Sequence, residues 1–227
     1  MKYLLTTLFL SAFVYTTNGQ IKINNISGYI EPYFSTIRKV QDNVPSYYYD
    51  QSGKFGFAAG VVINIKSKSK LSTSIEAGIT NYGYKTKHFI KIEDTASQSV
   101  SEEWSNYSLT AFRIGIGEKI DLLKNKLSLY LGINASIPLG NGKEEATLLI
   151  LQQANKLIID KTNKHPEGIN ESQLNAVVNF STPISNKLSV GILTEYGLSY
   201  INNYHAGDFF ARQMKFGVQI KYSIKQY

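Results

Sequence analysis

Three glutamates stand inside stretches that otherwise have the composition of β-strands. They are Glu31 in ISGYIEPYF, Glu76 in LSTSIEAGITNYGY and Glu195 in LSVGILTEYGLSY. Because side chains alternate between the two faces of a strand, Glu195 shares a face with Ser189 and Gly191. Most of the apolar residues of the stretch take the other face. The acids therefore belong to small and polar faces, and one explanation should cover all three.

Arg113 and Lys215 are the cations that suit these acids, because each lies on the small and polar face of its own stretch. Unpaired charges are costly in the interior of a protein. We therefore expect the pairs Glu76–Arg113, Glu195–Lys215 and Glu31–Lys215. The favoured interpretation is a static polar plug that fixes strand register. The alternative is a gate, in which rearranged ion pairs open a narrow pore.

Catalysis is the other chemistry to consider. The histidines are His88, His165 and His205, and His205 stands near Asp208 with Ser199 a few residues earlier. A hydrolase needs a nucleophile, a base and an orienting group within hydrogen-bond reach, which nothing in this spacing enforces. The chain has no cysteine, so disulfides and thiolate metal sites are excluded. We expect no catalytic residue, no metal site and no cofactor.

The elements that must position these residues show a period of two. In FGFAAGVVINIK, the phenylalanines and alternate aliphatic residues share one face, opposite glycine and asparagine. Such segments span about 26–37, 54–66, 70–84, 105–120, 126–139, 173–184, 187–201 and 209–225. Several exceed the usual strand length of about five or six residues and suit a tilted membrane strand of about 9–11. The prediction is an all-β fold, an eight-stranded antiparallel up-and-down transmembrane barrel.

The glycine-bearing face decides between a membrane barrel and a soluble, lipocalin-like barrel. An eight-stranded barrel has an interior just wide enough for side chains, so small residues belong inside. Glycines on a face exposed to water would only weaken the strands. The apolar face should therefore contact lipid.

The connections alternate between short and long, which is the layout of an outer-membrane barrel. The short turns are rich in lysine. The long outer loops are expected at about 38–53, 85–104, 140–172 and 202–208. Residues 1–19 read as a secretory signal peptide, with a basic start and an apolar stretch, so the barrel should span 20–227.

Within the third long loop, residues 144–160 have a broad apolar arc on a helical projection. We expect a helix here, which could cover the barrel mouth, lie on the outer leaflet or bind a partner. The alternative is a β-hairpin that extends the fifth and sixth strands.

Aromatic residues and one arginine mark the outer rim. Aromatic rings prefer the membrane–water interface, so those near the long-loop ends of the strands predict a girdle: Tyr33, Phe34, Tyr47, Tyr48, Tyr49, Tyr82, Tyr84, Trp104, Tyr107, Tyr200, Tyr204, Phe209 and Phe210. Arg212 is in phase with the lipid-facing Phe210 and Met214, and its side chain is expected to reach lipid phosphates.

The formal charge of +7 does not indicate nucleic-acid binding. Much of the positive charge lies at the short-turn rim, where it can approach anionic inner-leaflet phospholipid: Lys66, Lys68, Lys70, Lys124, Lys126, Lys187, Lys221 and Lys225. The expected partners are outer-membrane lipid and, through the loops, extracellular or envelope proteins, with the chain itself a monomer.

Alternation, lysine-rich tight turns, inward glycines and a final amphipathic strand ending at Tyr227 resemble the small outer-membrane β-barrel proteins of Gram-negative bacteria, the OmpA-like and PorT-like families. One departure is that Tyr222 and Ile224 are in phase with the lipid face, whereas Tyr227 is not. The resemblance implies a location in the cell outer membrane. The expected function is a non-enzymatic structural or surface-interaction role. The alternatives are a narrow gated channel, an accessory subunit of a secretion or motility machine and, last, a lipid-modifying enzyme.

Overall fold

The computed structural model describes residues 22–41, 48–66, 71–94, 97–123, 126–140, 142–152, 155–164, 172–200 and 210–226. The signal peptide expected at 1–19 lies outside these residues. Every regular element among them is a β-strand. The same residues include no helix with the length and apolar character needed to cross a membrane.

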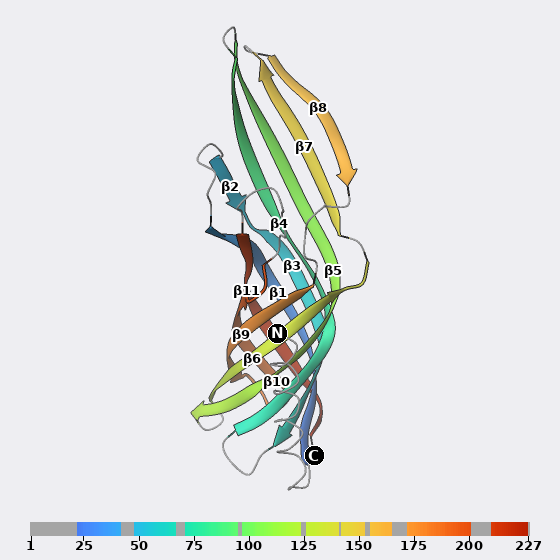
Figure 1. Cartoon of the computed structure of the whole chain (residues 1–227). Coiled ribbons are helices and arrows are strands. Elements are labelled where there is room, and N and C mark those ends of the chain that lie inside the picture. Colours follow the sequence, from blue (N-terminus) through green and yellow to red (C-terminus); the bar gives the residue numbers. More distant parts are fainter. Residues whose placement is uncertain are drawn as a thin grey trace.

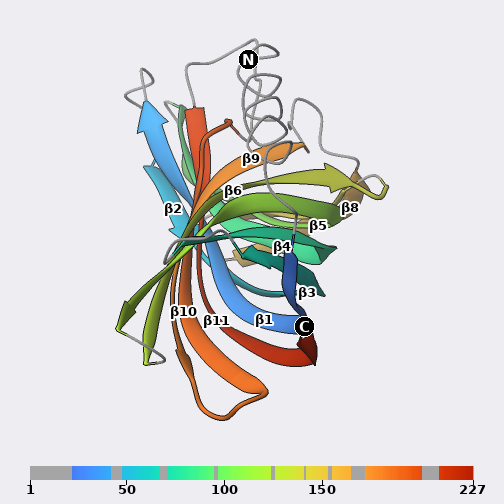
Figure 2. The same ribbon diagram turned by 90° about the horizontal axis from the view of Figure 1, so that it is seen from below.

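Eight strands form a closed antiparallel barrel, as predicted. In barrel order they are β1 (Lys22–Gln41), β3 (Lys54–Lys66), β4 (Leu71–Asp94), β5 (Ser97–Leu123), β6 (Leu127–Pro138), β9 (Gln173–Pro183), β10 (Leu188–Gly197) and β11 (Phe210–Gln226). Pairing of β1 with β11 closes the ring, so no barrel strand has a free edge in this part of the molecule. Seen from below, the strands curve around one another (Figure 2).

The barrel is polar inside and apolar outside. Buried residues include Glu31, Arg113, Asn134, Gln219 and Lys215, whereas Ile192 is 70% exposed and Ile30 is 55% exposed. Alternation along each strand produces this distribution, because one register serves both faces. The exposed apolar residues recur around the ring and form an outer apolar belt: Ile30, Phe34, Phe57, Val61, Ile75, Ile79, Phe112, Ile114, Leu131, Ile137, Val178, Phe180, Ile192, Phe216 and Val218.

One end of the barrel has short connections. Between β9 and β10, the amides of Ile184 and Ser185 both donate to the carbonyl of Leu188, at 2.8 and 3.1 Å. The end of β11 lies at this same end, opposite the start of β1, since Asn25 pairs with Gln226. We call this the short-turn rim.

The other end carries an outer sheet that projects well beyond the ring (Figure 1). β4 and β5 stay paired from Leu71↔Ile120 to Asp94↔Ser97. The loop predicted at 85–104 is therefore wrong, because the two strands continue to satisfy each other's backbone groups after they leave the ring. β2 (Tyr48–Ser52), inside the loop predicted at 38–53, pairs with β4. The loop predicted at 202–208 lies outside the described residues.

The helix predicted over 144–160 is also wrong. The segment is a hairpin of β7 (Lys143–Gln152) and β8 (Asn155–Lys164). β7 pairs with the outer half of β5, from Ser108↔Lys143 to Val100↔Leu151. The open side of β5 offers a ready hydrogen-bonding ladder, which favours strand over helix for the aliphatic run TLLIL. The outer sheet thus has the order β2–β4–β5–β7–β8.

Candidate functional site

Arg113 stands at the centre of the barrel interior, on the inward face of β5. Its side chain is fully buried. Its Nη1 lies 2.9 Å from Glu31 Oε1, and its Nη2 lies 2.9 Å from both Glu76 Oε1 and Glu195 Oε1. Its Nε also donates to Glu76 Oε1 at 2.9 Å. One guanidinium thus binds acids from β1, β4 and β10 across the lumen, which suits its planar array of donors.

Lys215 adds a second cation on the side of Glu195. The two residues are direct partners in the register of β10 and β11, and Lys215 Nζ lies 3.1 Å from Glu195 Oε2. Asn134 Nδ2 donates to Glu195 Oε1 at 2.8 Å, and Asn175 Nδ2 donates to Asn134 Oδ1 at 2.9 Å. The polar network therefore continues onto β6 and β9.

Glu31 does not form the expected pair with Lys215. It binds Arg113, and its Oε2 accepts a hydrogen bond from Gln219 Nε2 at 3.0 Å. The register explains the difference, because Lys215 lies opposite Ser35 on β1. Ser35 is four residues from Glu31, which is about 13 Å along a strand. The predicted pairs Glu76–Arg113 and Glu195–Lys215 are both present.

Gly115 makes room for this arrangement. A Cβ added there would lie 2.6 Å from Glu76 Oε1 and 2.7 Å from Glu76 Cγ. The side chain of Glu76 therefore occupies the space that Gly115 leaves on the next strand. Tyr29 is accommodated in the same way, since a Cβ on Gly78 would lie 2.7 Å from its hydroxyl.

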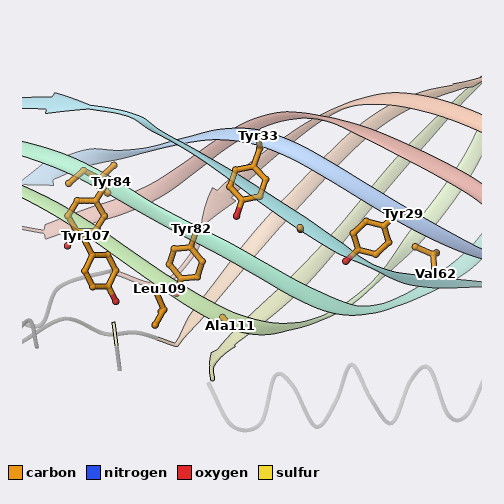
Figure 3. Packing of buried hydrophobic residues seen from close by; sticks show 10 residues of the cluster. Tyr29, Tyr33, Val62, Tyr82, Tyr84, Tyr107, Leu109 and Ala111 are labelled. Carbon is orange, nitrogen blue, oxygen red and sulfur yellow. The ribbon is translucent and has the colours of Figure 1, made fainter. Parts of the chain in front are cut away.

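Tyrosines surround the charged residues and continue toward the outer sheet. Figure 3 shows the rings of Tyr29, Tyr33 and Tyr82 along the interior, with Tyr84 beside Tyr107. The Nζ of Lys215 lies 5.1 Å from the ring centroids of both Tyr33 and Tyr82, close enough for a cation–π contact.

The predicted outer girdle is wrong for several of its members. Tyr33, Tyr82, Tyr84 and Tyr107 are buried inside the barrel, at 2, 2, 9 and 1% exposure. They have the same phase as the inward acids on β1 and β4 and as Arg113 on β5. Phase along the strand decides which side a ring takes, and closeness to the strand end does not.

Sequence reasoning assigned no role to the interior amides Asn134, Asn175, Asn179, Gln213 and Gln219. All five are at most 3% exposed. Asn179 Nδ2 donates to Gln219 Oε1 at 2.5 Å, which links β9 to the carboxylate of Glu31. Gln213 and Gln219 have the parity of Lys215 on β11, and the three asparagines lie on the small and polar faces of β6 and β9, which is the signal that would have found them.

Arg212 lies apart from the interior network, on the outward face of β11. The centre of its guanidinium is 4.8 Å from the ring centroid of Tyr200 and 5.8 Å from that of Tyr196. His88 is described by its backbone alone, and His165 and His205 lie outside the described residues. Ser199 Oγ accepts a hydrogen bond from the amide of Leu174 at 3.0 Å. Among the residues described, no three His, Cys, Asp or Glu side chains gather as metal ligands would.

No protein-family model matches the chain, and no curated protein sequence matches it. Several solved structures are similar to the chain at low identity. The attachment invasion locus protein Ail of Yersinia pestis matches at 11% identity and a TM-score of 0.44, over 89% of this chain and 100% of its own. Neisserial surface protein A matches at 10% identity and a TM-score of 0.38, over 87 and 97%. OprG from Pseudomonas aeruginosa matches at 7% identity and a TM-score of 0.39, over 89 and 97%.

Proposed function

We propose that the chain is an integral outer-membrane protein whose filled barrel anchors an outer sheet for binding other polypeptides at the cell surface. The apolar belt is the observation that carries the membrane location. Large apolar side chains such as Ile192 and Ile30 are exposed around the ring, while charged residues are buried. In water, the exposed apolar side chains and the buried charges would both be unfavourable. In a lipid bilayer, the apolar side chains face lipid and the charges are kept away from it, so both are favourable.

The filled interior supports an anchoring role in preference to conduction. Arg113 connects strands from opposite parts of the ring, and the network is completed by Lys215 and by amides. Toward the outer sheet, Lys54 Nζ donates to Asn106 Oδ1 at 2.9 Å and to the carbonyl of Tyr107 at 3.3 Å, contacts that link β3 to β5 past the intervening β4. Catalysis has no support from these contacts, and the proposed role is non-enzymatic.

The outer sheet supports the interaction role. Its order ends in β2 on one side and β8 on the other. An edge strand presents a row of backbone donors and acceptors to which an extended segment of another protein can add. The partner class proposed is therefore a polypeptide that binds by strand addition at this sheet.

The absence of cysteine allows a direct test of the topology. Ser97→Cys places a thiol at the tip of the β4–β5 hairpin, and Lys187→Cys places one in the exposed turn before β10. On intact cells, a membrane-impermeant maleimide should label the first variant and should label the second only after the outer membrane is permeabilised. Equal labelling of both variants on intact cells, or recovery of the protein in a soluble fraction, would refute the proposed location.

The interaction role needs its own test. A photo-crosslinking residue in place of Asn155, at the start of the edge strand β8, should give a crosslinked polypeptide adduct on intact cells. The matched control carries the same residue at Lys187, where the adduct should be missing. Identical crosslinking patterns at the two positions would contradict binding at the outer sheet.

A further inference from the structure

We infer that Arg212 is the centre of a binding site for the phosphate group of an outer-leaflet lipid. This inference rests on the proposed membrane location. Arg212 is the third residue of β11 and shares its outward face with Phe216 and Val218, which are 46 and 41% exposed. It lies four residues from Phe216 in the direction of the outer sheet, about 13 Å along the strand. That position is where the apolar belt gives way to lipid headgroups.

Two tyrosines hold the guanidinium of Arg212 in place. The ring of Tyr200 is 4.8 Å from its centre, and Nη2 points to the Tyr200 hydroxyl at 3.5 Å. The ring of Tyr196 lies 5.8 Å away. Aromatic stacking restricts the planar group and leaves its edge available for hydrogen bonds.

The hydrogen-bonding capacity of Arg212 is incompletely used. Among the described residues its Nε is buried and has no hydrogen-bond partner, and the contacts of the guanidinium are with tyrosines rather than with a carboxylate. The fork of an arginine matches a phosphate group with two parallel hydrogen bonds, so a lipid phosphate would supply the anionic partner that the tyrosines do not.

A second arginine occupies the facing position. Arg38 on β1 is the direct register partner of Arg212. The backbone register thus brings a second positively charged residue to the same level of the barrel wall as Arg212.

The test uses refolded full-length protein in detergent micelles, titrated with lipid A carrying its phosphates and with the same lipid stripped of them. The wild type should bind the phosphorylated lipid at least about tenfold more tightly than the stripped lipid, and Arg212→Gln should lose about tenfold in affinity for the phosphorylated form, as expected for one charge-assisted hydrogen bond. Arg38→Gln should weaken the same binding. Tyr200→Phe should retain it, and Tyr200→Leu should not.

Lys187→Gln is the matched control, because it removes one positive charge at the short-turn rim, and its affinity should equal that of the wild type. Heat-modifiable gel mobility of each variant shows whether the barrel has folded, so a failure of lipid binding is distinct from a failure of the membrane-barrel proposal. Equal affinity of the wild type and Arg212→Gln would overturn the inference. So would inorganic phosphate displacing the lipid at similar concentration, because the site would then recognise free phosphate.

Discussion

At the scale of single residues, the charge network inside the barrel has more acids than cations. Arg113 contacts three carboxylates, and Glu195 is shared with Lys215. Removing one partner leaves a buried charge uncompensated, which is much more destabilising than replacing the whole pair with apolar residues. The positions of these side chains are therefore tightly constrained, as the close packing of Glu76 against Gly115 illustrates.

Gly115→Ala is expected to destabilise the barrel by about 1–3 kcal/mol, the usual cost of overpacking. The added Cβ would lie 2.6 Å from a carboxylate oxygen of Glu76, which cannot withdraw without leaving Arg113. Denaturant unfolding in micelles would measure the change. Gly140→Ala is the control, since a Cβ there meets nothing within 4 Å, and it should be close to neutral. Equal stability of the two variants would show that the fit around Glu76 is loose.

At the scale of elements, β5 divides its pairing between two neighbours. Its inner half pairs with β6, from Ala111 onward, and its outer half pairs with β7, from Val100 to Ser108. β4 accompanies it along both halves. The ring and the outer sheet are thus separate on one side of β5 and continuous on the other.

Replacing residues 143–164 by a short flexible linker should leave the barrel folded, because no ring pairing involves them. Amide hydrogen exchange should accelerate in the outer half of β5, at those amides that bond to β7. Exchange in Ala111–Ile120, where β5 pairs with β6, should stay unchanged. Faster exchange throughout β5 would mean that the hairpin supports the ring as well.

At the scale of the whole molecule, buried side chains occupy the middle of the ring. Arg113 and Lys215, the largest fully buried cationic side chains, pair with acids near the middle of the lumen. Tyrosines lie toward the outer end. An eight-stranded ring has no room for a water column beside such side chains.

Refolded wild-type protein in a planar bilayer should therefore give no conductance steps. Arg113→Ala removes the central side chain, and it is the variant in which leak should appear if any interior substitution opens the ring. Steps in the wild type that disappear in Arg113→Ala would contradict the filled barrel and would favour the gated-channel alternative. Arg212→Ala, outside the ring, is the matched control and should behave as the wild type.

The strand phase was predictable from the sequence, because a period of two assigns every residue of a strand to one side at once. This is why Glu31, Glu76, Arg113, Glu195 and Lys215 were expected on inward faces, where they are buried. Register was not predictable, because it depends on how far neighbouring strands are displaced along each other. Glu31 was consequently assigned to Lys215 in place of Arg113.

The outer sheet was not predictable for a different reason. The aliphatic run in β7 fits a helix or a strand by its own pattern, and the outcome depends on whether a neighbour offers an open ladder. That neighbour, the outer half of β5, had itself been assigned to a loop. The unpredicted extension of β5 beyond the ring therefore accounts for both wrong predictions, the loop at 85–104 and the helix over 144–160.

The partners of Arg113 come from both ends of the chain. Its first acids, Glu31 and Glu76, come from strands that precede it in the chain, whereas Glu195 and its companion Lys215 come from the last two strands. A ring without β10 and β11 would leave Arg113 with two of its three acids. The strands that close the ring against β1 are therefore also the strands that complete the charge network.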